Sequence, residues 1–199
     1  MILKICGITN PEDAAAAIAG GATAIGFNFW LKSPRYIDPE RAAEIVTTGV
    51  RRVGVFVNES PARVEAIAAI ARLDVAQLHG DESAADYPEN MAVWKAARVD
   101  EHFEFSAYAT CPVEALLLDG PAGDLFGGSG KRFDWSRVAA IRKQIILAGG
   151  LDASNVAGAI ALAHPWGVDA CSRIESSPGK KDLRKMNEFL RAAKAALRA

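Results

Sequence analysis

The sequence is poor in the residues that mark metalloproteins and disulfide scaffolds. It contains only three cysteines and three histidines in 199 residues. The cysteines Cys6, Cys111 and Cys171 are odd in number and far apart, which excludes a disulfide framework and favours reduced thiols. No group of His, Cys and acidic residues has the spacing of metal ligands. We therefore expect no metal site.

Long hydrophobic runs and an excess of one charge are also missing. No stretch approaches the roughly 18 apolar residues that cross a bilayer, and the N-terminus has neither the basic region nor the cleavage site of a signal peptide. The 23 basic residues balance 24 acidic ones, and only the run from Lys180 to Lys185 is densely basic. We therefore expect neither nucleic acid nor a membrane as partner, and we predict a cytoplasmic location.

What the sequence does contain is a regular alternation of strand and helix signals. Short apolar or β-branched runs, which predict strands, recur at 3–6, 22–27, 52–57, 75–79, 93–96, 115–119, 144–147 and 167–171. Helix signals lie between them: Asn10, Asp38 and Ser60 each precede a proline, as an N-cap residue does. The helices that follow Asp38 and Ser60 are predicted over 41–48 and 62–72, two more over 152–163 and 181–198, and the segment 100–110 carries only a weak signal.

This alternation predicts the fold class. Strands separated by helices pair in parallel, and eight such units favour closure into an α/β barrel of the (β/α)8 or TIM type. At 199 residues it would be a minimal barrel, with one domain over residues 1–199. An open, doubly wound sheet is the alternative.

Chemically active side chains follow the strand ends, where a barrel of this kind builds its active site. Cys6 ends the first predicted strand, and Lys4 lies on the same side of that strand, where its charge would lower the pKa of the thiol. Asp119 ends the sixth strand, so that Cys6 and Asp119 form a candidate base and acid pair. Taken singly, Cys6 reads as a small buried hydrophobe, Asp119 as a turn residue, Arg35 as a surface charge and His79 as a core histidine.

The loops after the seventh and eighth strands carry a candidate phosphate site. Gly149 and Gly150 precede a predicted helix, where backbone N–H groups can turn toward an anion. Ser172 follows the eighth strand, and these two loops are where barrels of this type commonly bind phosphate.

Several longer motifs resemble those of the phosphoribosylanthranilate isomerase family of tryptophan biosynthesis. They span residues 4 to 182 and comprise Lys4–Asn10, Gly26–Phe29, Lys32–Tyr36, Val53–Asn58, Gln77–Gly80, Gly127–Lys131, Phe133–Trp135 and Pro178–Asp182. The resemblance implies a cofactor-free Amadori rearrangement of N-(5-phosphoribosyl)anthranilate to 1-(2-carboxyphenylamino)-1-deoxyribulose 5-phosphate. It implies a small phosphorylated substrate as the binding partner and a chain that is a monomer or a homodimer.

The resemblance implies a catalytic or binding role for each candidate residue, according to its position in these motifs. Cys6 would be the general base and Asp119 the general acid, which must hold a proton to act. Arg35 would bind the anthranilate carboxylate, with its planar fork suited to a bidentate pair. The backbone of Gly149 and Gly150 and the segment of Ser172 and Arg173 would bind the phosphate, and His79 is counted among the substrate-binding residues.

The sequence departs from the family pattern at Leu31, where proline is usual, and at Arg173, where glycine is usual. We expect Arg173 to have an ordinary backbone and to turn its guanidinium to the phosphate; the alternative is a strained left-handed residue that points to solvent. Two other functions compete. One is the related isomerase of histidine biosynthesis, whose substrate carries two phosphates, and the other is a non-catalytic barrel that binds a phosphorylated metabolite.

Overall fold

Eight parallel strands close into a barrel in the computed structural model, which describes residues 1–100, 103–108, 110–120 and 143–197. In chain order the strands are β1 Ile2–Cys6, β2 Ala24–Asn28, β3 Arg51–Phe56, β4 Val75–Leu78, β5 Ala92–Arg98, β6 Ala115–Asp119, β7 Ile145–Leu147 and β8 Gly167–Ala170. β1 pairs with both β2 and β8, so that Lys4 lies opposite Ala24 on one side and Asp169 on the other. The predicted barrel is confirmed, and the open sheet is excluded. A single domain over residues 1–199 stays a prediction.

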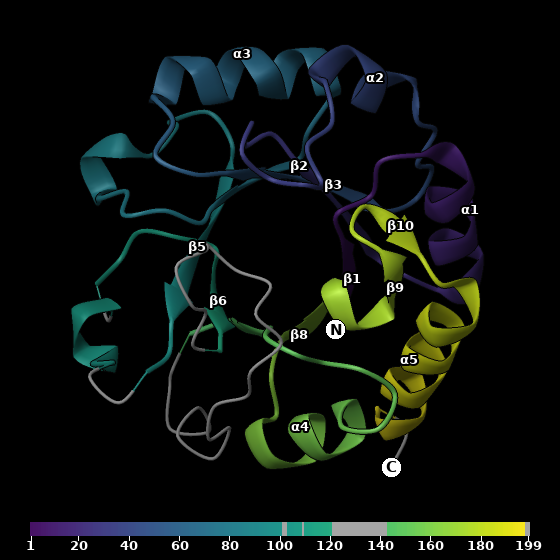
Figure 1. Cartoon of the computed structure of the whole chain (residues 1–199). Helices are drawn as coiled ribbons and strands as arrows, with labels where there is room; N and C mark the ends of the chain where they lie inside the picture. The colour runs from purple at the N-terminus through teal and green to yellow at the C-terminus, as the bar shows by residue number, and fades with distance from the viewer. Residues whose placement is uncertain (101–102, 109, 121–142, 198–199) are drawn as a thin grey trace.

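The helices lie outside the barrel, and the first three begin directly after the predicted capping residues. They are α1 Pro11–Gly20, α2 Pro39–Glu44, α3 Pro61–Ala71, α4 Val156–Ala163 and α5 Leu183–Ala196, with short 3-10 turns η1 Ala84–Asp86, η2 Phe105–Tyr108 and η4 Ser172–Ile174. The side chains of Asn10, Asp38 and Ser60 each accept a hydrogen bond from the first turn of their helix. Figure 1 shows α2 and α3 on one side of the barrel, α4 on the opposite side, and α1 beside α5.

Two helix predictions were wrong at one end. α2 ends at Glu44 rather than at residue 48, because the following β-branched residues disfavour a helix and the buried guanidinium of Arg52 takes the carbonyls of Ala42 and Ile45. α4 begins at Val156 rather than at residue 152. The side-chain amide of Asn155 donates to Gly150 O and accepts from Asp152 N. These two hydrogen bonds stabilise a turn over the residues that were predicted as the first turn of the helix.

A two-stranded hairpin after β8 was not predicted. Its strands are β9 Glu175–Ser177 and β10 Lys180–Lys181, and the turn between them contains Gly179 with a φ of 81°. The hairpin takes the residues at the start of the last predicted helix, so that α5 begins at Leu183 with Asp182 as its N-cap. Lys181 N donates to the side chain of Asp13 in α1, which fixes the hairpin to that helix.

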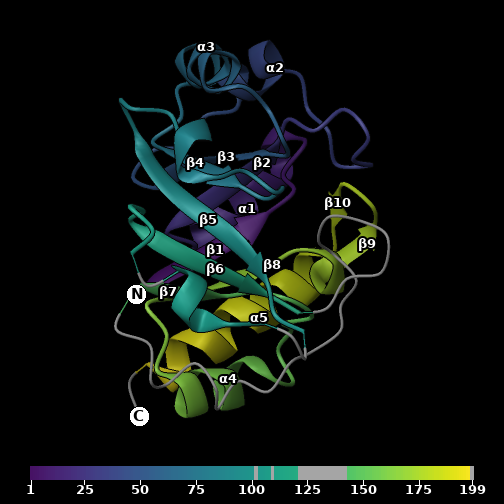
Figure 2. The ribbon, with the colours of Figure 1, turned by 90° about the vertical axis from the view of Figure 1, so that its left-hand side faces the viewer.

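The apolar residues form two cores, and the period of two along each strand separates them. The outer core lies between strands and helices and includes Leu3, Ile5 and Leu118. The inner core fills the barrel and includes Ile2, Trp94 and Leu117. In Figure 2 the strands run obliquely between the layer of α2 and α3 and the layer of α4 and α5.

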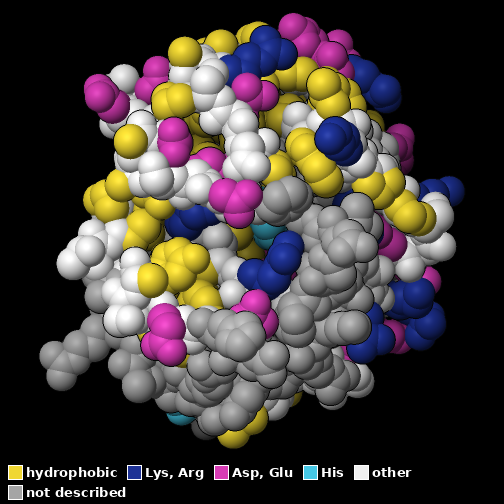
Figure 3. Space-filling model, turned by 60° about the vertical axis from the view of Figure 1, so that its left-hand side comes forward, with side chains coloured by type: hydrophobic (Ala, Val, Ile, Leu, Met, Phe, Trp, Pro, Cys, Tyr) yellow, Lys and Arg dark blue, Asp and Glu magenta, His cyan; other side chains and the backbone are white. Residues whose placement is uncertain are grey.

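The same alternation points the chemical side chains inward. On β1 the inner residue Ile2 is followed by Lys4 and Cys6, and on β6 Leu117 is followed by Asp119. Each inward position at the C-terminal end of its strand therefore faces one mouth of the barrel. On the outside, Figure 3 shows acidic and basic side chains interspersed over the described part of one face, in keeping with the balanced charge.

Candidate active site

A pocket of about 300 Å³ opens at the C-terminal ends of the strands. This volume lies at the lower end of the range of small-molecule sites. All the site residues predicted from the sequence line it: Cys6, Arg35, His79, Asp119, Gly149, Gly150, Ser172 and Arg173. The structure therefore brings together residues that lie up to 167 positions apart, from Cys6 to Arg173.

Cys6 lies in a cluster of charged and sulfur groups at the floor of the pocket. The Cys171 thiol donates a hydrogen bond to Cys6, and this bond holds the pKa of Cys6 well below its ordinary value. Burial opposes the shift, while the ammonium of Lys4 adds to it through its charge and a hydrogen bond. Lys4 thus lowers the pKa of Cys6 as predicted, and the largest single cause of the lowering is Cys171.

Lys4 is itself held by a carboxylate on the neighbouring strand. Its Nζ lies 3.0 Å from Asp169 Oδ2, and the Lys4 side chain is fully buried. Burial lowers the pKa of Lys4, but the charges of Asp169 and Cys6 outweigh burial and raise it, so Lys4 stays an ammonium. Burial raises the pKa of Asp169 to about 7, against the attraction of Lys4. Asp169 Oδ1 is buried and accepts no hydrogen bond within the described part of the chain.

The carboxyl group of Asp119 lies next to the imidazole ring of His79 in the lining of the pocket. Asp119 Oδ2 lies 3.5 Å from His79 Nε2, and His79 Nδ1 lies 2.9 Å from the amide nitrogen of Gln77. The contact with the Gln77 amide orients the imidazole ring so that Nε2 is directed at Asp119. Gln77 and His79 therefore fix which oxygen of Asp119 turns to the protein wall.

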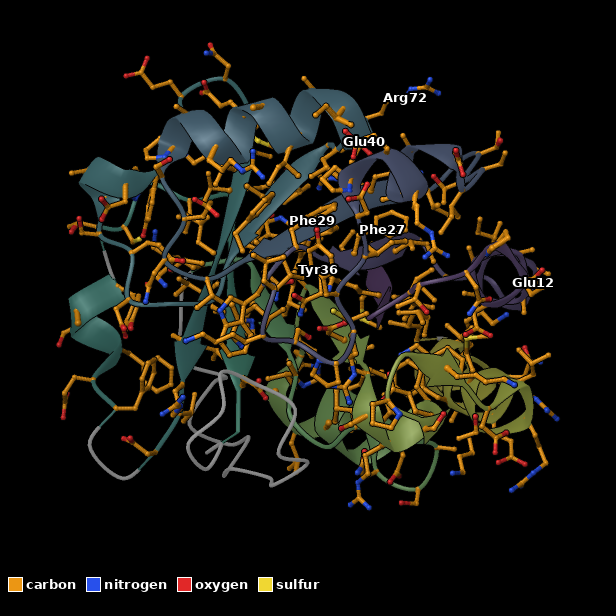
Figure 4. All side chains as sticks on the ribbon, turned by 45° about the horizontal axis from the view of Figure 1, so that its top comes forward. Glu12, Phe27, Phe29, Tyr36, Glu40 and Arg72 are labelled. Atoms are coloured by element: carbon orange, nitrogen blue, oxygen red, sulfur yellow. The ribbon has the colours of Figure 1, made fainter. Side chains whose placement is uncertain are left out.

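Arg35 comes from the loop between β2 and α2, which folds over the barrel mouth. Phe29 in this loop stacks on Phe56 of β3 with ring centroids 5.4 Å apart, and Ile37 N donates to Asn28 O. Figure 4 shows Phe29 and Tyr36 over the middle of the barrel, whereas Glu12 and Arg72 lie at the margin of the molecule. The loop thus carries Arg35 to the pocket.

The guanidinium of Arg35 is paired with a carboxylate of the unpredicted hairpin. Its Nε lies 2.9 Å from Glu175 Oε1 and its Nη2 lies 2.8 Å from Oε2. Lys181 Nζ holds the same carboxylate at 2.8 Å from Oε1. Nε and Nη2 of Arg35 thus serve Glu175, while Nη1 takes no part in this pair and leaves the end-on edge of the guanidinium, Nη1 with the second N–H of Nη2, to face the pocket.

The loop after β7 needs glycine at Gly149. Its φ is 82°, and a Cβ there would lie 2.8 Å from Asp119 Oδ1 and against the Gly120 backbone. Gly150 follows with a φ of 66°, so two left-handed residues in succession turn the chain at the mouth of the barrel.

The second half of this region is the η4 turn after β8, which begins at Ser172. Arg173 is not among the described residues with a positive φ. The expectation of an ordinary backbone is confirmed, and the strained alternative is wrong. The Arg173 side chain lines the pocket with its Nε 3.5 Å from Asp152 Oδ2, which places its charge between the two loops.

Comparisons with known proteins identify the family. A family model described as N-(5'-phosphoribosyl)anthranilate (PRA) isomerase matches residues 3–192. The chain belongs to this family. A member from Solibacter usitatus, named N-(5'-phosphoribosyl)anthranilate isomerase, is 69% identical over 199 residues, which cover 100% of both chains. The expected family and isomerase activity are thereby confirmed.

Solved structures of the phosphoribosylanthranilate isomerase family share the fold. The Thermotoga maritima enzyme superposes with a TM-score of 0.90 at 40% identity, covering 98% of this chain and 100% of that one. A family member in complex with reduced 1-(o-carboxyphenylamino)-1-deoxyribulose 5-phosphate gives 0.86 at 37% identity over 98% and 100%. Monomers of the dimeric Thermotoga maritima enzyme give 0.87 at 39% identity, again over 98% and 100%.

Against this family background, sequence reasoning missed several residues of the site. Asp169, Glu175 and Lys181 had no assigned role, and neither did the hydrogen bond from Cys171 to Cys6. The pairing of β8 with β1 would have found Asp169, since the register sets it opposite Lys4, but that pairing follows only from closure of the barrel. The family motifs Gly127–Lys131 and Phe133–Trp135 lie outside the described residues.

Within the described residues, no group of three or more His, Cys, Asp or Glu side chains could hold a metal ion. None of the helices that the structure describes is long and apolar enough to cross a membrane.

Proposed function

We propose that the chain catalyses the isomerase reaction of its family, with Cys6 as general base and Asp119 as general acid. The substrate is N-(5-phosphoribosyl)anthranilate, and the product is 1-(2-carboxyphenylamino)-1-deoxyribulose 5-phosphate. The observation that carries the proposal is one pocket in which a thiol of lowered pKa and a carboxyl group line the same mouth. The reduced product analogue bound to a family member has the carboxylate and phosphate that this pocket would hold.

The acid acts first. Asp119 gives its proton to the ring oxygen of the ribose as the bond between that oxygen and C1 breaks, which leaves a protonated Schiff base. The contact with His79 Nε2 turns Oδ2 to the wall, and Gly149 leaves room beside Oδ1, which can then face the substrate. General acid catalysis of this kind contributes roughly 10² to 10⁴ in rate.

The base acts second. The thiolate of Cys6 takes the proton from C2, whose acidity is raised by the adjacent iminium, and an enolamine forms that tautomerises to the ketone. Cys171 and Lys4 stabilise the thiolate before this step. The base gains one proton and the acid loses one, so the net reaction is an isomerisation and both groups return to their starting state by proton exchange.

Binding at both ends of the substrate sets the reacting carbons between the two catalytic groups. The end-on edge of Arg35 holds the anthranilate carboxylate, while Glu175 fixes the other edge and so orients the fork. The phosphate binds to the backbone of Gly149, Gly150 and Ser172, and the guanidinium of Arg173 adds a charge at this end.

The middle of the substrate finds acceptors for its hydroxyl groups. Asp169 Oδ1 and Gln77 Oε1 are buried in residues that line the pocket, and neither has a hydrogen-bond partner within the described part of the chain. A buried acceptor without a partner is costly, and the ribose hydroxyls can donate to these two. With the proposed substrate bound, both of these acceptors therefore gain a hydrogen-bond donor.

Location and assembly remain part of the proposal. The three cysteines are free thiols in the structure, which supports a reducing compartment such as the cytoplasm. The Thermotoga maritima relative, with its dimer and its monomers, supports the expectation of a monomer or a homodimer. Cell fractionation and light scattering test these two points.

A turnover assay tests the function. Phosphoribosylanthranilate is generated in place from anthranilate and phosphoribosyl pyrophosphate, and its consumption is followed by fluorescence. Rapid loss of signal that depends on the purified chain supports the proposal. The absence of turnover, or turnover only with the two-phosphate substrate of the histidine pathway, contradicts it; the former result would favour a binding barrel.

A further inference from the structure

Two thiols lie side by side in the pocket. β1 and β8 pair in parallel with Ile5 opposite Ala170, so Cys6 and Cys171 are the next residues along the same register. Residues at matching positions of parallel strands point to the same face. Both residues line the same pocket, and each lies close enough to the other to shift its pKa.

This arrangement fits the geometry of a disulfide. Adjacent strands are about 4.8 Å apart, and bridged cysteines have Cα atoms roughly 4.4 to 6.8 Å apart. Cys6 also lines the open pocket although it is only 9% exposed, and Cys171 lines it as well. A small oxidant that enters the pocket from the barrel mouth therefore meets both residues.

The two thiols differ in reactivity. Cys6 is the nucleophile, since its pKa is lowered and two ammonium groups, those of Lys4 and Lys181, act on it. Cys171 keeps its proton, because its hydrogen bond to Cys6 and its burial raise its pKa. A thiolate beside a second thiol is the arrangement in which oxidation stops at a disulfide instead of proceeding to irreversible acids.

We propose that hydrogen peroxide converts Cys6 and Cys171 into a reversible disulfide that switches the enzyme off. The Cys6 thiolate attacks one peroxide oxygen, the O–O bond breaks, and the departing hydroxide takes a proton to become water. The Cys171 sulfur then attacks the sulfenic acid on Cys6, so that an S–S bond forms, the S–O bond breaks, and the hydroxyl leaves as water with the Cys171 proton. The two thiols lose two electrons, which reduce one peroxide to two waters.

The switch in activity rests on the proposed role of Cys6 as general base, whereas the disulfide itself does not. A sulfur in a disulfide cannot accept the C2 proton, so the oxidised enzyme loses turnover. Reduction by a dithiol returns the thiolate and the activity by thiol–disulfide exchange.

The test measures covalent state and activity on the same samples. The full chain is treated with hydrogen peroxide, and intact mass, peptide mapping and turnover are recorded before and after dithiothreitol. We expect the mass to fall by two hydrogen atoms, one peptide pair to link Cys6 to Cys171, and turnover to fall at least about tenfold and to recover with dithiothreitol.

Two variants make the test specific. Cys171→Ser keeps a hydrogen-bond donor near Cys6 but removes the second sulfur, so we expect it to gain oxygen atoms under peroxide and to recover only part of its own starting activity. Cys111→Ser removes the third thiol, which lies beside Tyr87, and should behave as the wild type does.

The outcomes separate this proposal from the proposed function. A wild type that gains oxygen atoms, a disulfide that involves Cys111, or full recovery of Cys171→Ser after the same exposure would overturn the disulfide. A disulfide between Cys6 and Cys171 in a chain that never turned over the substrate would support the bridge and overturn the proposed function. A disulfide that forms without loss of turnover would overturn the switch.

Discussion

Replacement of Gly149 by alanine tests whether the loop after β7 and the acid of the site depend on each other. A left-handed backbone costs a non-glycine residue roughly 1 to 2 kcal/mol, and the φ of Gly149 is 82°. The new Cβ would lie 2.8 Å from Asp119 Oδ1 and against the Gly120 backbone, and crowding of this kind costs a further 1 to 3 kcal/mol or so. The free energy of unfolding should therefore fall by about 2 to 5 kcal/mol.

Gly158→Ala is the matched control. Gly158 lies on the exposed side of α4, and a Cβ there meets nothing within 4 Å. Alanine at this position should raise the free energy of unfolding by about 0.5 to 1 kcal/mol, since alanine favours the helix.

Urea unfolding and turnover measured on both variants decide the matter. Gly149→Ala should lose stability and also kcat, because the displaced carboxyl of Asp119 no longer meets the ring oxygen, whereas Gly158→Ala should keep its kcat. A Gly149→Ala variant with the stability and kcat of the wild type would refute the reasoning about this loop.

Three further predictions concern the remaining parts of the pocket. Cys171→Ala removes the hydrogen bond that lowers the pKa of Cys6, so the acid limb of the pH profile of kcat/KM should move to higher pH. An acid limb at the wild-type pH would show that Cys171 does not activate the base. Arg173→Gly should raise KM about fivefold with little change in kcat and weaken inhibition by inorganic phosphate, since a partly exposed charge contributes about 1 kcal/mol; steady-state kinetics that show an unchanged KM would place this guanidinium outside phosphate binding. Arg35→Ala should raise KM at least about tenfold, the size of a lost charge-assisted pair, and initial rates over a range of substrate concentrations would disprove the carboxylate contact if KM stays the same.

The eight barrel strands were predictable because each one is a short apolar or β-branched run. Every end of these eight strands lies within two residues of its predicted place. The strand ends then located the site, since the carboxyl ends of parallel strands meet at one mouth. Cys6 and Asp119 were found in this way.

Contacts between residues far apart in the sequence could not be predicted in this way. The bidentate pair of Arg35 with Glu175 joins residues 140 positions apart, and it depends on a hairpin whose strands are only two or three residues long. Such short strands leave almost no periodicity to read. The sequence likewise showed an arginine in place of glycine at Arg173, but only the backbone of the η4 turn decided between the two alternatives.

The central claim is that Cys6 and Asp119 are the base and acid of one isomerase site, and the turnover numbers of Cys6→Ala and Asp119→Asn test it most directly. Each kcat should fall at least about 100-fold, while the affinity for the reduced product analogue, measured by titration, stays close to that of the wild type. A variant that retains most of the wild-type kcat would contradict the role assigned to its residue.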